Sequence, residues 1–129
     1  MRDVKRVSHH AHRRSAPSMD YQQIADDARK EALELYKAAP EVMRSFQGLM
    51  SAVGKEGALS VKTKELMALA IAISTRCEGC IVFHVNNAMR HGANRQEVVE
   101  TITVAIEMGG GPSTVYGAKA LSAFDTFGA

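Results

Sequence analysis

Residues 66 to 73 read LMALAIAI, and this stretch decides the fold. Its side chains are apolar nearly all round a helix, so a helix that contains it has to be buried on most sides. Ser60 lies just upstream and is a plausible N-cap, which predicts a helix over about 61–75. We expect this helix to be the central element of the core.

Two further helices are predicted upstream of this element. Apolar residues recur at helical spacing over about 24–39 and again over 42–53. Pro40 ends the first run and sits in the first turn of the next, and Gly54 is a C-terminal stop for the second. The segment KEGALS at 55–60 then predicts a loop.

Three helices are predicted downstream. One begins at CEGC and runs over about 77–91, and a capping box of Asn94 and Glu97 opens the next. The glycines of MGGGP at 108–112 break that helix, and the last one continues to about residue 124. No alternating strand pattern and no internal repeat is present. The sequence therefore predicts an all-α, single-domain bundle of about six helices.

Length and composition set the broad class. A chain of 129 residues with 46% hydrophobic residues is enough for one domain with one core. The longest apolar run is well short of the roughly 18 residues that suggest a membrane span. Because the N-terminus has no apolar stretch that could be the core of a secretory signal, we expect a cytoplasmic protein. In that compartment a lone cysteine pair is typical of a catalytic or metal-binding site.

The N-terminal segment 1–18 is basic. The first fifteen residues carry a net charge of +4, and the remainder of the chain carries −2. With His9, His10 and His12, such a tail can bind nucleic acid, a membrane surface or a metal. No aromatic or apolar cluster accompanies the charges, so a disordered, solvated tail is the favoured interpretation, and the early Asp3 disfavours a transit peptide. The helical domain is then expected over 19–129.

Residues 77 to 84 read CEGCIVFH and contain both cysteines of the chain. On a helix, Cys77, Cys80 and His84 share one face because they are three, four and seven residues apart. If the helix begins at Cys77, both thiols lie in its first turn, where the unpaired N–H groups and the helix dipole favour a thiolate. A nearby imidazole can accept the thiol proton. The pattern indicates a nucleophilic pair that can close into a disulfide.

The residues alone leave other interpretations open. Two cysteines can be small buried hydrophobic residues without chemistry. Zinc is also possible, with Cys77, Cys80, His84 and His91 as ligands, although one helix stripe cannot easily surround a tetrahedral ion. His91 precedes Gly92, so a C-terminal cap is the favoured interpretation for it. Glu65, twelve residues before Cys77, can be a first-turn acid that stabilises the helix dipole.

The segment from 64 to 121, KELMALAIAISTRCEGCIVFHVNNAMRHGANRQEVVETITVAIEMGGGPSTVYGAKAL, resembles the alkylhydroperoxidase D-like branch of the carboxymuconolactone decarboxylase family. The resemblance covers about residues 40–126. The specific part of the resemblance is a pattern of spacings. A glutamate precedes the first cysteine of a CxxC by twelve residues, and a histidine follows the second cysteine by four. The sequence HGA and an acidic capping position come after them. Glu65, Cys77, Cys80, His84 and His91 match this pattern in order and spacing.

The resemblance implies a role for each matched residue. Cys80 is expected to attack a peroxide, and Cys77 is expected to resolve the resulting sulfenic acid into a disulfide. Glu65 and His84 resemble the proton relay of the family, in which the glutamate orients the imidazole that deprotonates Cys80. Helical rise favours the same assignment, because His84 is roughly 6 Å along the axis from Cys80 and 10 Å from Cys77. Helix-dipole reasoning alone favours Cys77 as the nucleophile.

Two features bear on the activity. Some peroxidatic members have a histidine or another polar residue before the second cysteine, where this chain has Gly79, which puts high peroxidase activity in doubt. Decarboxylases of the superfamily generally lack the cysteine pair, which argues against lactone decarboxylation. The expected function is a thiol-dependent hydroperoxide reductase or disulfide oxidoreductase. The alternatives are a carboxymuconolactone decarboxylase-type lyase and a helical scaffold with inert cysteines.

The expected partners are a peroxide substrate and a dithiol reductant such as lipoamide or a thioredoxin-like protein. We expect no cofactor, no metal, no nucleic acid and no membrane. Since LMALAIAI is apolar on every face and aromatic residues make up only 5% of the chain, one subunit has too little material to cover it. A homo-oligomer is therefore expected, and the resemblance implies a trimer or hexamer, of which we favour the hexamer.

Overall fold

The computed structural model describes residues 19–129, which form six α-helices and no strand. The helices are α1 (Tyr21–Ala38), α2 (Pro40–Val53), α3 (Val61–Ser74), α4 (Glu78–Arg90), α5 (Arg95–Gly109) and α6 (Gly111–Phe127). The predicted all-α fold is confirmed, and the helix boundaries agree with the predicted ones to within a few residues. The predicted basic tail, 1–18, lies outside the described residues.

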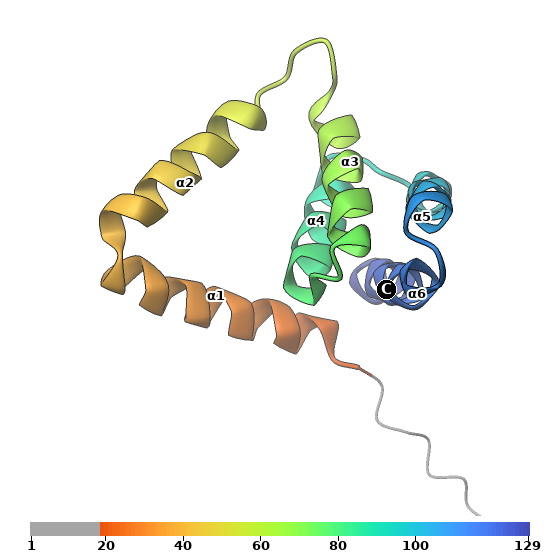
Figure 1. Ribbon diagram of the computed structural model, residues 1–129, viewed down its shortest axis with the longest axis horizontal. Coiled ribbons are helices and arrows are strands. Elements are labelled where there is room, and N and C mark those ends of the chain that lie inside the picture. The colour runs from red at the N-terminus through yellow and green to blue at the C-terminus, as the bar shows by residue number, and fades with distance from the viewer. Residues whose placement is uncertain (1–18) are drawn as a thin grey trace, which may run out of the picture.

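Helices α3 to α6 form the body of the domain (Figure 1). Helix α3 packs against α4 and α5, and α6 packs against both of those helices. The largest fully buried apolar side chains come from α3, α4 and α5: Leu69, Ile73, Ile81, Val82, Val85 and Val98. Helix α3 thus contributes to the core as predicted.

One expectation for α3 needs correction. Leu69, Ala72 and Ile73 are buried, but Met67 and Ile71 on the opposite face are 51% and 62% exposed. Within one chain, α3 is therefore buried on its inner side only, whereas the sequence predicts burial on most sides. The reason is geometrical, because α4, α5 and α6 all contact the inner side of α3 and neither α1 nor α2 packs on its outer side.

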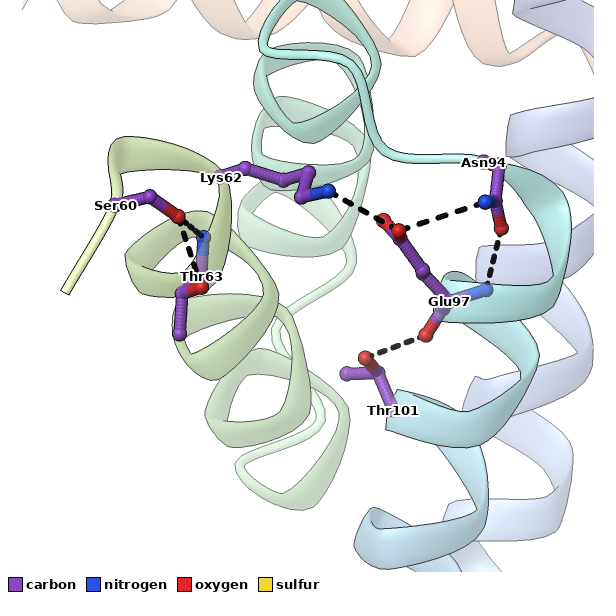
Figure 2. Close-up of polar contacts among 6 residues, drawn as sticks. All are labelled: Ser60, Lys62, Thr63, Asn94, Glu97 and Thr101. Atoms are coloured by element: carbon purple, nitrogen blue, oxygen red, sulfur yellow. Dashed lines mark hydrogen bonds and ion pairs between the residues drawn. The ribbon is translucent and has the colours of Figure 1, made fainter.

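The predicted caps of α3 and α5 are present. Ser60 Oγ accepts a hydrogen bond from the Thr63 backbone N–H at 3.1 Å, and Asn94 Oδ1 accepts one from the Glu97 N–H at 2.9 Å (Figure 2). The Glu97 carboxylate differs from the predicted capping box. Its Oε1 accepts hydrogen bonds from Lys62 Nζ at 3.1 Å and from the Asn94 side-chain amide at 3.4 Å. This contact ties the start of α5 to the start of α3.

A sharp turn joins α3 to α4 and positions the first cysteine. Arg76 has φ of 58°, its N–H donates to the Ile73 carbonyl, and the Cys77 N–H donates to the Ala72 carbonyl. These two hydrogen bonds form a Schellman motif, in which the left-handed position is usually glycine. Because the turn ends at Cys77, this residue becomes the N-cap residue of α4.

Glycines make the other two turns of the body. Gly92, with φ of 89°, occupies the same position after α4, where the Ala93 N–H donates to the Ala88 carbonyl. Gly110, with φ of 71°, separates α5 from α6. At Gly117, a Cβ atom would collide with Ile102 Cγ2, so this glycine lets α6 approach α5 closely.

The first two helices extend from this body. Helix α1 lies against α4 and α6, whereas α2 packs only on α1 and has no buried residue (Figure 1). Figure 1 shows α1 and α2 as the two arms of a V, with α2 standing clear of α3. In the part of the chain that the structure describes, none of the helices is long and apolar enough to cross a bilayer.

Candidate active site

The two cysteines lie at the N-terminus of α4 and form a disulfide. Cys77 is the N-cap residue, and its Sγ accepts a hydrogen bond from the Cys80 backbone N–H at 3.3 Å. Cys80 is exposed and Cys77 is half-buried. The two cysteines are therefore not both buried, as the alternative of two small core residues requires, and the disulfide lies at the positive end of a helix dipole.

Glu65 and His84 are in direct contact. Glu65 Oε2 lies 2.7 Å from His84 Nδ1, and the contact joins α3 to α4. Both side chains are mostly shielded from solvent, with exposed fractions of 18% for Glu65 and 24% for His84. With Nδ1 donating its proton to the carboxylate, the lone pair of the neutral imidazole is on Nε2, which is then the nitrogen that can act as a base.

The contact with His84 decides between the two interpretations of Glu65. The helix-dipole interpretation requires an acid in the first turn of α3, but Glu65 is the fifth residue of that helix, which has no acid in its first turn. It is therefore a side chain aimed at α4 and not a capping acid.

His84 also shares its helix face with Cys80, one turn away, as the spacing predicts. The structure thus brings Glu65 to the helix that carries the cysteine pair and His84.

His91 lies apart from this pair, at the other end of α4. It is the C-cap residue, and its backbone N–H donates to the carbonyls of Asn87 and Ala88. The predicted capping role is confirmed and is carried by the backbone. Within residues 19–129, no group of three or more histidine, cysteine, aspartate or glutamate side chains is arranged to hold a metal ion.

Sequence reasoning missed two neighbours of the site. The first is Phe83, whose ring lies edge-on to His84 with centroids 5.0 Å apart and which is 46% exposed. The second is a shallow groove of about 320 Å³ between α1 and the start of α4, lined by Ile24, Asp27, Ala28, Glu31, Glu78 and Gly79. The spacing of Asp27 and Glu31 on one face of α1 was a signal for an acidic wall, but only packing places it beside α4.

Gly79 can be assessed directly. A Cβ atom at this position would meet nothing within 4 Å, so the space around it does not require glycine. Gly79, the residue before Cys80, lines the groove between α1 and α4. Glycine supplies no polar group beside Cys80.

The fold and the site together define a small all-α domain with a CxxC disulfide at the N-terminus of helix α4. Residues 40–123 match the sequence model of the Carboxymuconolactone decarboxylase family. The chain belongs to this family. The predicted resemblance is confirmed at the level of the family.

Relatives and solved structures agree with this assignment. An uncharacterized protein of Cupriavidus necator is 43% identical over 95 residues, which cover 74% of this chain and 84% of the relative. A carboxymuconolactone decarboxylase family protein from Legionella pneumophila has 42% identity and a TM-score of 0.82, covering 84% of this chain and 97% of its own. A family protein from Thermotoga maritima has 32% identity and a TM-score of 0.71, covering 78% and 86%.

Proposed function

We propose that this protein is a thiol-dependent hydroperoxide reductase that works through the Cys77–Cys80 disulfide, in the cytoplasm. The observation that carries the proposal is the 2.7 Å contact between Glu65 and His84, with His84 one helical turn from Cys80. A carboxylate that orients an imidazole next to a thiol is the arrangement of base-activated nucleophilic catalysis. In addition, a part in an antioxidative response has been suggested for the Thermotoga maritima relative.

The first step consumes the peroxide. His84 Nε2 takes the proton of the Cys80 thiol, and the thiolate attacks the terminal oxygen of the hydroperoxide. An S–O bond forms, the O–O bond breaks, and the proton goes from the imidazolium to the leaving alkoxide. The products are a sulfenic acid on Cys80, which has lost two electrons, and an alcohol. Glu65 stabilises the imidazolium that exists between the two proton transfers.

The second step closes the disulfide. The Cys77 sulfur attacks the sulfur of the sulfenic acid, the S–S bond forms, and water leaves with the proton of the Cys77 thiol. A dithiol reductant, lipoamide or a thioredoxin-like protein, then returns two electrons and two protons and becomes a disulfide itself. The exposure of Cys80 supports its roles in both steps, since peroxide and reductant have to reach the same sulfur.

One local effect favours Cys77 over Cys80 as the attacking thiol. The Cys80 N–H donates to Cys77 Sγ, and the N-cap position favours negative charge on Cys77. This hydrogen bond stabilises a thiolate but supplies no base that can accept its proton. His84 is one turn from Cys80 and two turns from Cys77, so the imidazole favours Cys80.

Single-cysteine variants test the proposal. We expect Cys77→Ser to consume one equivalent of peroxide and to stop as a sulfenic acid on Cys80, which dimedone traps and mass spectrometry locates. Cys80→Ser is expected to react little. In the native protein, a small excess of hydrogen peroxide should remove both thiols, and dihydrolipoamide should restore them. Circular dichroism controls for the fold of each variant.

Two outcomes would contradict these assignments in different ways. A sulfenic acid on Cys77 in Cys80→Ser, with Cys80 inert in the other variant, would reverse the two roles. Thiols that survive peroxide in the well-folded native protein would remove the redox function. The alternatives would then be a lyase of the decarboxylase type, for which the family is named, or a scaffold with inert cysteines.

A further inference from the structure

The groove of about 320 Å³ between α1 and the start of α4 lies next to the disulfide. Its wall on α4 consists of Glu78 and Gly79, which are the two residues enclosed by the Cys77–Cys80 disulfide. Because neighbouring Cα atoms in a chain are about 3.8 Å apart, each of these two residues is one step from a cysteine. A molecule in the groove is therefore beside the disulfide.

Three carboxylates line this groove, Asp27 and Glu31 on α1 and Glu78 on α4. Asp27 and Glu31 are one turn apart on the same face of α1, and both are exposed. The apolar residues Ile24 and Ala28 complete its α1 side. Among the described residues that line the groove, none is a lysine or an arginine. The groove is therefore an anionic surface beside a disulfide.

Ion pairs do not neutralise the charge of the groove. Within residues 19–129, none of the three carboxylates forms a salt bridge. Asp27 Oδ1 accepts a hydrogen bond from the uncharged amide of Gln23 at 2.8 Å. Arg29, also on α1, pairs with Asp26, and neither of these residues lines the groove. The three negative charges therefore act on whatever approaches the disulfide from this side.

A disulfide that turns over has to be reduced by an external thiol. In that step the thiolate of a dithiol attacks Cys80 Sγ, the bond to Cys77 breaks, and the electron pair leaves on the Cys77 sulfur at the N-cap position. The second thiol of the reductant then attacks the mixed disulfide, closes the disulfide of the reductant and releases Cys80, and both protein thiols take up the protons of the dithiol. The reductant thus brings its own charge to the groove.

We propose that the groove guides the reductant to the disulfide, and that Asp27, Glu31 and Glu78 select neutral or cationic dithiols against anionic thiols. The proposal rests on the redox function proposed above and names the class of reductant. A unit charge at about 10 Å from one carboxylate in water changes an encounter rate by about two-fold. Three carboxylates therefore give a several-fold preference at low ionic strength, and salt weakens this preference.

Three reagents with the same dithiol and different charges test the selection. Dihydrolipoate is anionic, dihydrolipoamide is neutral, and the dihydrolipoyl amide of ethylenediamine is cationic. Stopped-flow kinetics measures how fast each one reduces the oxidised protein, without oxygen and without peroxide. At low ionic strength we expect the rates to rise in this order, several-fold for each unit of charge, and the differences to shrink in high salt. The groove also repels the attacking thiolate itself, but this effect cancels because all three reagents share it.

Substitutions at Glu31 locate the effect in the groove. Since Glu31 is exposed, Glu31→Gln and Glu31→Lys should leave the fold intact. We expect the dependence on reagent charge to weaken in Glu31→Gln and to weaken further in Glu31→Lys. Glu56→Gln is the matched control, because Glu56 is exposed and lies before the start of α3, about 20 Å of helix away from the turn that leads to the disulfide. This control should keep the native dependence.

Equal rates with the three reagents would overturn the selection and leave the redox function standing. A dependence on charge that Glu31→Lys does not change, or that Glu56→Gln weakens as much, would overturn the assignment to the groove. An oxidised protein that none of the reagents reduces would overturn the redox function and this proposal together. Asp27→Asn repeats the test on the same face of α1 if the variants at Glu31 lose helical content.

Discussion

At the scale of residues, the contact between Glu65 and His84 is the most informative feature. The two side chains are nineteen positions apart and belong to different helices, and both are mostly shielded from water. A shielded carboxylate needs a hydrogen-bond donor, and the imidazole Nδ1–H supplies one. The contact therefore satisfies the carboxylate and at the same time fixes which nitrogen of His84 can accept a proton.

Glu65→Gln should keep the fold and slow peroxide consumption. A neutral amide no longer stabilises the imidazolium, so we expect kcat/KM to fall by about 10- to 100-fold, as for loss of an orienting partner. Glu65→Asp retains the charge and should recover part of the rate. Glu107→Gln, at an exposed position of α5, is the matched control. Unchanged kinetics in a well-folded Glu65→Gln would leave the carboxylate without a catalytic role.

At the scale of elements, the two ends of α4 are set by the same kind of turn made from different residues. The turn before α4 has Arg76 in the left-handed conformation, and the turn after it has Gly92 there. A residue with a Cβ pays roughly 1–2 kcal/mol for this conformation, whereas glycine does not. The turn that contains Arg76 in this conformation also places Cys77 at the N-cap position.

Exchanges at these two turns should have opposite effects. We expect Arg76→Gly to stabilise the protein by on the order of 0.5 kcal/mol, because relief of the left-handed strain exceeds the added entropy of the unfolded chain. Gly92→Ala should destabilise it by about 1 kcal/mol for the reverse reason. Urea unfolding of the two variants measures both changes. A destabilised Arg76→Gly would mean that the arginine side chain makes a compensating contribution.

An ion pair connects the start of α5 with the end of α6. Arg95 Nε and one terminal nitrogen donate to the two carboxylate oxygens of Asp125, at 2.9 and 3.1 Å. The hydrogen bonds from Arg95 lower the pKa of Asp125 below its usual value of 3.8. Both side chains are exposed, so the contribution to stability is small.

The sign of its pH dependence follows from the lowered pKa. The pair contributes fully above the pKa of Asp125 in the unfolded chain, and the contribution is lost as the pH falls through the lower pKa of the folded protein. We therefore expect the stability difference between the native protein and Asp125→Asn to shrink below pH 3.8. Urea unfolding over a pH series checks this, with a second series in high salt as a control. A difference that grows at low pH would contradict the assignment.

At the scale of the whole molecule, the chain consists of a packed body and an arm. The body, α3 to α6, contains the fully buried core, and α2 contains no buried residue at all. Substitutions in the buried core of the body should therefore lower the stability of the protein more than substitutions of the exposed side chains of α2.

The assembly expected from the sequence is a hexamer. Its mass would be near 84 kDa, six times the 14.0 kDa chain, and a trimer would be near 42 kDa. Sedimentation or light scattering at several micromolar concentrations distinguishes them. A mass of 14.0 kDa throughout this range would contradict any oligomer.

Local signals in the sequence determined the helices. Ser60 and Asn94 cap helices through a hydrogen bond to a residue three positions away. Pro40 begins a helix and Gly92 ends one through their own backbone conformations. The stripe of Cys77, Cys80 and His84 was predictable for the same reason, since helical spacing fixes it. The pattern that includes Glu65 came from a family resemblance, and its catalytic role stays a prediction.

Only the tertiary structure decided what crosses between elements. The packing of α3 on α4 places Glu65 Oε2 against His84 Nδ1, and the packing of α1 puts an acidic wall beside Gly79. It also left the outer side of α3 open, although the same LMALAIAI stretch is apolar all round. Periodicity says that a face is apolar, but not which neighbour covers it. That depends on helix directions and crossing angles, which many distant side chains set together.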